Sequence, residues 1–215
     1  LVVDEFNTLD NYLDDLIKKG EIDEVGKVRV KDELYRVLEE SSSYSSYSAR
    51  FAKTVKKSSD NVSSKIKNYE KKIKNKTHEH GKIVNESEKV DITHAEKKYV
   101  DKIDWSHIPL SKFIKSVVTH NHPKGTGLSL TDVKMFLLAE LEELRAVLPN
   151  GSVYSLKNVK LDLDKRKELL KFIKDQTELV NKEYQTLDKY FKEAIVFGKL
   201  WEEMKNSVEY VKYIN

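Results

Sequence analysis

Apolar residues near the start of the chain recur at steps of three and four, which is the period of a helix with one buried face. The pattern predicts a helix over residues 10–19 that ends at Gly20, and a second helix over residues 31–40. A serine-rich stretch, residues 41–48, follows and is typical of a loop or linker.

The same spacing returns near the end of the chain. From Leu161 to Val211 apolar residues step at threes and fours, with no proline and with Gly198 as the one glycine. We therefore expect one very long amphipathic helix, or two helices packed as a hairpin that breaks between Asn181 and Gly198.

Short apolar runs separated by turn signals occupy the centre of the chain. Residues 113–119 predict a buried strand, and Ser129 is expected to begin a helix. Residues 145–148 and 152–156 flank an Asn-Gly pair at 150–151, the strongest short signal for a β-hairpin.

A further hairpin is expected where residues 66–74 and 82–92 flank a His-Gly pair. Together these elements predict an α+β protein with a small antiparallel or mixed sheet and a packed helix in residues 61–160. Long helices from residues 1–60 and from residues 161–215 are expected to flank this domain.

Charge is unevenly distributed along the 215 residues. Residues 1–40 carry twelve acidic and six basic side chains, whereas residues 41–90 carry five acidic and twelve basic ones. Such asymmetry indicates an interaction surface or two segments that dock on each other. The lysines from Lys53 to Lys76 are interrupted by no arginine, which suits weak phosphate contact with a nucleic acid or simply a solvated lysine-rich surface.

Two classes of site are excluded or disfavoured by composition. The chain has no cysteine, which excludes disulfides and thiolate metal sites. It has no glycine-rich phosphate loop, which disfavours nucleotide hydrolysis, and no apolar run of membrane-spanning length, so no membrane contact is expected.

The candidate chemistry lies in Thr-His-Asn-His-Pro, with Ser129 and Asp132 shortly downstream. His120 and His122 are two residues apart, so at the end of a strand both rings point the same way. A carboxylate from the next helix could supply a third ligand, and three protein ligands plus water are typical of a catalytic zinc. Ser-x-x-Asp is also a helix capping box, and a His-x-His pair is also a common loop feature, so both structural interpretations remain open.

These motifs resemble the JAB/MPN metalloproteases, including their RadC-type bacterial branch. The similarity is greater still to a domain of phage head-morphogenesis proteins (minor head, MuF-associated) and related phage toxins. It covers roughly residues 66–157 and neither helical flank. The matching pieces are residues 81–84, 120–123, 129–132, 146–147, 150–151 and 153–156.

The resemblance implies a JAB-like fold and hydrolysis of a peptide or isopeptide bond. It implies a zinc ion with three ligands, His120, His122 and Asp132. Ser129 would steady the oxyanion or the attacking water, and a glutamate on the first strand would be the general base. Glu70 lies where that strand is expected, and Glu79 is the alternative.

Two functions from different classes follow. The first is a phage-type head-morphogenesis protein with a zinc-dependent hydrolase site, located in the cytoplasm or in the virion. The second is a structural or interaction protein in which the motif only shapes a loop. In this second case the helical flanks would bind capsid, DNA, or a toxin or immunity partner. In either case we expect a protein partner, and the C-terminal helices could mediate oligomerisation.

Overall fold

The computed structural model describes residues 48–85, 90–95 and 103–214, together with a few isolated positions between Asp14 and Lys27. The helix expected over residues 31–40 lies outside the described residues, as does most of the helix expected over residues 10–19 and most of the serine-rich stretch.

Seven strands form one mixed sheet in the order β1-β7-β6-β5-β4-β2-β3. The β1–β7 and β4–β5 pairs are parallel, and the other four pairs are antiparallel. The strands are β1 (Lys53–Lys56), β2 (His80–Asn85), β3 (Val90–Ala95), β4 (Val117–Asn121), β5 (Glu143–Val147), β6 (Val153–Asn158) and β7 (Val208–Ile214).

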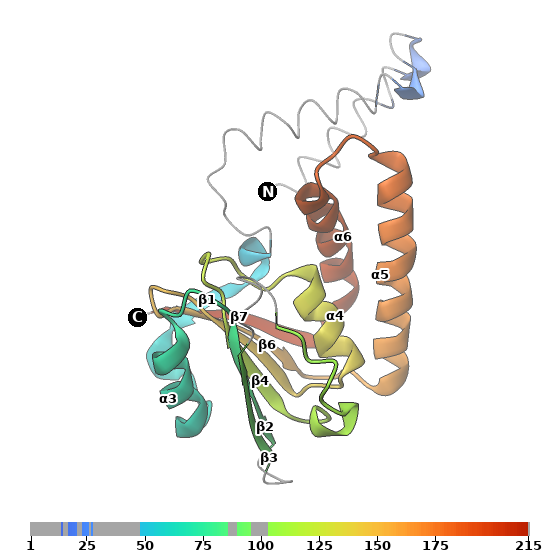
Figure 1. Cartoon of the computed structure of the whole chain (residues 1–215). Helices are drawn as coiled ribbons and strands as arrows, with labels where there is room; N and C mark the ends of the chain where they lie inside the picture. The colour runs from blue at the N-terminus through green and yellow to red at the C-terminus, as the bar shows by residue number, and fades with distance from the viewer. Residues whose placement is uncertain are drawn as a thin grey trace.

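Helices cover the two faces of the sheet unequally. Within the described residues, a single helix lies on one face and the other helices form a layer on the opposite face (Figure 1). The single helix is α3 (Ser64–Ile73), and the opposite layer contains α4 (Leu130–Leu138), α5 (Leu163–Glu183) and α6 (Lys189–Met204). Short 3-10 turns, η1 (Ala49–Phe51), η2 (Lys57–Ser59) and η3 (Leu110–Lys112), complete the described elements. The α+β prediction is confirmed, with a larger sheet than expected.

The centre of the chain folds largely as its pattern predicts. The strand expected over residues 113–119 begins later, at Val117, and ends at Asn121 between the two histidines. It leads into a helix that begins after Ser129, and α4 connects the parallel strands β4 and β5. The Asn-Gly hairpin joins β5 to β6, and Gly151 has the positive φ of 82° that this turn requires.

The hairpin expected from residues 66–74 is wrong. Those residues lie in α3, because Ile66, Glu70 and Ile73 are spaced four and three apart and form one buried helical face. The partner of β2 in the hairpin is β3 instead.

The C-terminal segment is a helical hairpin, as one of the two alternatives predicted. It breaks after Glu183, and Asp188 caps the start of α6 by accepting a hydrogen bond from the backbone of Tyr190 at 2.6 Å. The helical prediction is wrong for the last residues, which form β7. Five of the seven residues of β7 are β-branched or aromatic, and strands on both sides supply hydrogen bonds.

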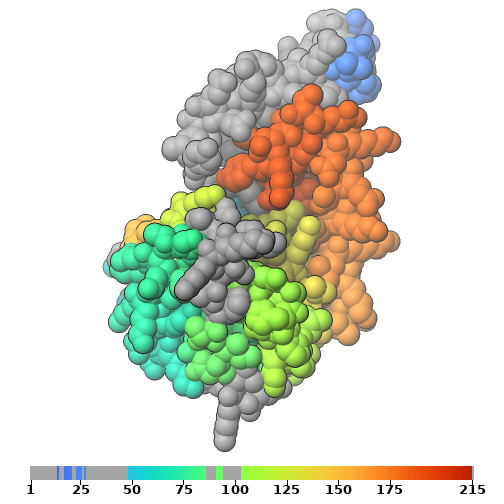
Figure 2. Space-filling view, in the orientation of Figure 1, coloured from blue at the N-terminus to red at the C-terminus, as the bar shows by residue number. Residues whose placement is uncertain are grey.

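The sheet extends beyond residues 61–160 in both directions, since β1 precedes that range and β7 follows it. The larger apolar core lies between the sheet and helices α4, α5 and α6, and the smaller one lies on the α3 side. The space-filling view in Figure 2 shows α5 along one flank of the molecule and the α3 region along the other. Among the described residues, no helix combines the length and the apolar character needed to cross a membrane.

Candidate metal centre

The two histidines reach the same side of the sheet. Within β4, Thr119 and Asn121 hydrogen-bond to groups on the α3 side, so the alternating side chain of His120 faces α4. His122 follows the strand, and its backbone N–H donates to the carbonyl of Val147 at 3.0 Å, which continues the ladder to β5. Both rings are buried, and their Nε2 atoms lie 2.8 Å apart.

Asp132 joins them from the first turn of α4. Its Oδ1 atom lies 3.3 Å from His120 Nε2, and its Oδ2 atom lies 3.6 Å from His122 Nε2. One ligand atom from each of the three residues falls within 4.8 Å of the others. Two atoms bound to one tetrahedral zinc at 2.0–2.1 Å are about 3.3 Å apart. The three side chains could therefore hold one metal ion with little movement.

Asp132 serves the helix cap at the same time. Its Oδ2 atom accepts hydrogen bonds from the backbone N–H of Ser129 at 2.6 Å and from the Ser129 hydroxyl at 2.7 Å, while Ser129 Oγ accepts from the Asp132 N–H. The capping box and the ligand interpretation are thus compatible, because Oδ1 remains directed at His120. In this arrangement Ser129 positions the carboxylate.

A hydrogen bond on the far side of the His122 ring directs its Nε2 to the common centre. His122 Nδ1 lies 2.8 Å from the carbonyl oxygen of Thr126, which can only accept. The neutral ring therefore carries its hydrogen on Nδ1 and leaves the Nε2 lone pair available. His120 also interacts with the backbone of Arg145.

Burial and charge set the protonation of these groups. Burial lowers the pKa of His120, but the charge and hydrogen bond of Asp132 and the charge of Glu79 outweigh it, so the net shift is upward. Burial, and next the charge of His120, lower the pKa of His122. Burial would raise the pKa of Asp132, but the two histidines and Ser129 hold it well below its ordinary value, so this carboxylate is ionised at neutral pH.

Glu70 does not lie in this site, and the expectation that it is the general base is corrected here. It belongs to α3, on the opposite face of the sheet, where its Oε1 atom accepts from Thr119 Oγ1 at 3.0 Å and from Arg145 Nε at 2.7 Å. The alternative, Glu79, precedes β2 and places Oε1 3.8 Å from His122 Nε2. Glu79 is buried and is the second carboxylate of the candidate metal centre.

Asn121 holds Glu79 in place, a role that the sequence pattern did not predict. Its Oδ1 atom accepts from the His80 N–H at 2.6 Å, and its Nδ2 donates to the carbonyls of Lys76 at 3.2 Å and His78 at 3.1 Å. The side chain is fully buried. Its place between the two histidines already implies that it points to the other face, but the segment that it binds is more than 40 residues away.

Comparison of the chain with protein-family models, with curated proteins and with solved structures finds no match in any of the three.

Proposed function

We propose that the protein is a zinc-dependent hydrolase whose metal ligands are His120, His122 and Asp132 and whose general base is Glu79. The observation that carries the proposal is the convergence of two imidazole nitrogens and a carboxylate oxygen within 4.8 Å, with a second buried carboxylate 3.8 Å from His122. Among the described residues, this is the one group of histidine and acidic side chains whose arrangement could hold a metal ion.

The donor set suits zinc. Neutral imidazole and carboxylate are common zinc ligands, and three of them leave the fourth tetrahedral position open. When bound, zinc polarises a carbonyl group and lowers the pKa of a water ligand to about 7. Glu79 takes the proton from the attacking water and returns it to the leaving amine. Asp132 and the histidines stay fixed through Ser129, Thr126 and the Arg145 backbone.

The proposed substrate is a peptide or isopeptide bond, and the proposed setting is phage head morphogenesis. Both come from the resemblance to JAB/MPN proteins and to the phage head-morphogenesis domain. Two features support the JAB-like interpretation: His-x-His ends a strand, and Ser-x-x-Asp begins the next helix. The loop between His122 and Ser129 is one residue shorter than in the JAB motif, yet Asp132 still reaches the two rings.

The alternative is a structural or interaction protein without catalysis. The reciprocal capping box between Ser129 and Asp132 favours it, because that hydrogen-bond pattern is complete in the protein alone and fully accounts for Ser-x-x-Asp. Metal content separates the two proposals.

We expect the purified protein to bind one zinc ion per chain, measured by elemental analysis after dialysis. Asp132→Asn keeps an acceptor for the cap but loses the anionic ligand, so zinc affinity should fall by more than about 100-fold. Ser129→Ala is the matched control: it removes the cap hydroxyl and leaves the carboxylate. It should lower the free energy of unfolding by about 1 kcal/mol and zinc affinity by about tenfold, the low end of the range for losing a hydrogen bond to a metal ligand. Wild-type protein that binds no zinc, or an equal loss of zinc affinity in both variants, would support the structural alternative.

Zinc affinity should depend on pH with a slope set by one proton. The pKa of His120 is raised, so protonation begins to compete with zinc above the ordinary histidine value of about 6.5. The pKa of His122 is lowered, so that ring stays neutral and releases no proton. Zinc affinity should therefore fall by up to about tenfold for each unit by which the pH drops below the raised pKa of His120. Titration against a chelating dye from pH 8 to 5.5 tests this, and a two-proton slope would contradict it.

A further inference from the structure

The segment from Lys53 to Lys76 presents only positive charge to the surface. It contains nine lysines and two carboxylates, and both carboxylates are only 2% exposed. Arg145 binds both of them, with Nη2 2.6 Å from Asp60 Oδ2 and Nε 2.7 Å from Glu70 Oε1. The acidic groups of this segment are therefore buried, whereas most of its lysine side chains reach solvent.

The buried acids do not neutralise the surface lysines. Arg145 also pairs with Glu143 at 2.6 Å, so three carboxylates surround one guanidinium. Lys57 and Lys157 interact electrostatically with these carboxylates and offset the two remaining negative charges. The cluster is thereby neutral, and within the described residues it leaves no acidic group to compensate the other lysines of the segment.

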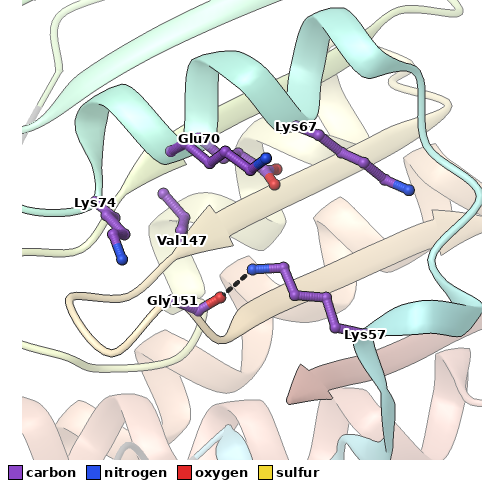
Figure 3. Close-up of a pocket in the computed structure, with 7 residues that line it drawn as sticks. Lys57, Lys67, Glu70, Lys74, Val147 and Gly151 are labelled. Atoms are coloured by element: carbon purple, nitrogen blue, oxygen red, sulfur yellow. Dashed lines mark hydrogen bonds between the residues drawn. The ribbon is translucent and has the colours of Figure 1, made fainter. Parts of the chain in front are cut away.

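A pocket of 280 Å³ lies beneath α3, beside the turn between β5 and β6. Figure 3 shows Lys67 and Lys74 extending from α3 on either side of Glu70, and Lys57 approaching from the segment after β1 to donate to the Gly151 carbonyl. Four lysines line the pocket: Lys57, Lys67, Lys71 and Lys74.

Among the described residues, no acidic side chain forms an ion pair with Lys67, Lys71 or Lys74. Lys67 Nζ donates to the backbone carbonyl of Asp60, and within the described ranges Lys71 and Lys74 form no ion pair. Ammonium groups crowded around one pocket repel one another, and an anion bound among them would relieve that repulsion. Burial lowers the pKa of Lys57, which agrees with its place in a crowded, partly desolvated pocket.

The positive surface is wider than the pocket. Lys65 and Lys72 are exposed on α3, a helix about 15 Å long, and Lys53 and Lys56 are exposed on β1. A ligand with regularly repeated negative charges fits this surface better than a single small anion. Lysine without arginine favours contact with phosphates over recognition of bases.

We propose that the lysine pocket beneath α3 binds the phosphodiester backbone of a nucleic acid without sequence preference. The pocket lies across the sheet from the candidate metal centre, so this proposal does not depend on the hydrolase proposal. Its ligand class follows from the four lysines that line one pocket, from the lack of ion pairs to Lys67, Lys71 and Lys74 within the described residues, and from the extent of the lysine surface.

Fluorescence anisotropy with labelled nucleic acid of mixed sequence tests the proposal, using duplex DNA, single-stranded DNA and RNA of equal length. The wild-type protein should bind at least one of them with an affinity that falls steeply between 50 and 200 mM salt. The variant K67Q/K71Q/K74Q should bind at least about tenfold more weakly at 100 mM salt. Its slope against log salt should be shallower by about 0.7–0.9 for each phosphate that the variant no longer neutralises.

The matched control is K165Q/K167Q/K174Q, which removes three charges from α5 on the opposite side of the molecule. It should bind within about twofold of wild type. If the circular dichroism spectrum shows that the pocket variant is unfolded, the single variant Lys71→Gln replaces it, because Lys71 is an exposed helical position. It should weaken nucleic-acid binding by a proportionally smaller factor.

Three results would overturn the proposal. One is the absence of salt-dependent binding to all three nucleic acids. Another is equal weakening by the pocket and control variants, which would indicate net charge alone. The third is calorimetric binding of tripolyphosphate, abolished in the pocket variant, by a protein that binds no nucleic acid, which would make the ligand a small phosphate compound.

Discussion

Glu79→Gln is expected to slow peptide hydrolysis by about 10²–10⁴-fold, the range for losing a general base, while one zinc ion per chain remains bound. Glutamine keeps the size of the side chain but cannot take a proton from water. The carboxylate of Glu79 lies 3.8 Å from His122 Nε2 and forms no part of the three-ligand group, so its charge is needed for the proton and not for the metal. The measurement is turnover of a quenched-fluorescence peptide library by zinc-loaded protein, with metal content determined on the same samples.

Glu70→Gln is the control, because Glu70 was the base expected from the sequence. It lies on the far face of the sheet and binds Thr119 and Arg145, so its loss should lower stability and leave turnover of the folded protein within a few-fold of wild type. Abolished turnover in the folded, zinc-loaded Glu70 variant, together with normal turnover in the Glu79 variant, would reverse the assignment.

Arg145→Met is expected to lower the free energy of unfolding by about 3–5 kcal/mol, because it leaves several buried carboxylates without their cation. Arg145 is fully buried, with Asp60, Glu70 and Glu143 all within 2.7 Å of its guanidinium nitrogens. Burial would lower its pKa, but these carboxylates raise it above the ordinary arginine value, so the side chain is always charged. Urea denaturation at pH 7 measures the loss.

Arg166→Met is the matched comparison. Arg166 is also buried, but its guanidinium donates to the backbone carbonyls of Phe136 at 2.7 Å and Leu141 at 2.9 Å. Its removal orphans two neutral acceptors and no charge, so the loss should be smaller, about 1–3 kcal/mol. Equal losses of unfolding free energy in the two variants would contradict this account of the cluster.

The local sequence pattern predicted the structure correctly wherever the interacting residues are close in the chain. Ser129 and Asp132 are three apart and form the capping box that their spacing predicts, and the Asn-Gly pair forms its hairpin. His120 and His122 share a side because strand side chains alternate. From these short-range rules the sequence alone predicts the three candidate ligands of the site.

The apolar spacing led to wrong predictions where the same spacing fits both a helix and a strand. Val208 and Val211 continue the helical steps of the preceding segment, but they also fit a strand, and the neighbours β1 and β6 decide in favour of β7. Glu70 shares a buried helical face with Ile66 and Ile73, although the run was expected to be a strand. Pairing partners far away in the chain supply the free energy that selects between such alternatives.

The sequence by itself determined the helical character of the C-terminal segment, the capped helix after Ser129 and the paired histidines, because each depends on residues within one or two turns of one another. Only the tertiary structure decided which glutamate stands beside the histidines, and which acids surround Arg145 from positions up to 85 residues away. The physical reason is that burial and charge pairing depend on which faces of the sheet the helices cover, and no local spacing contains that information.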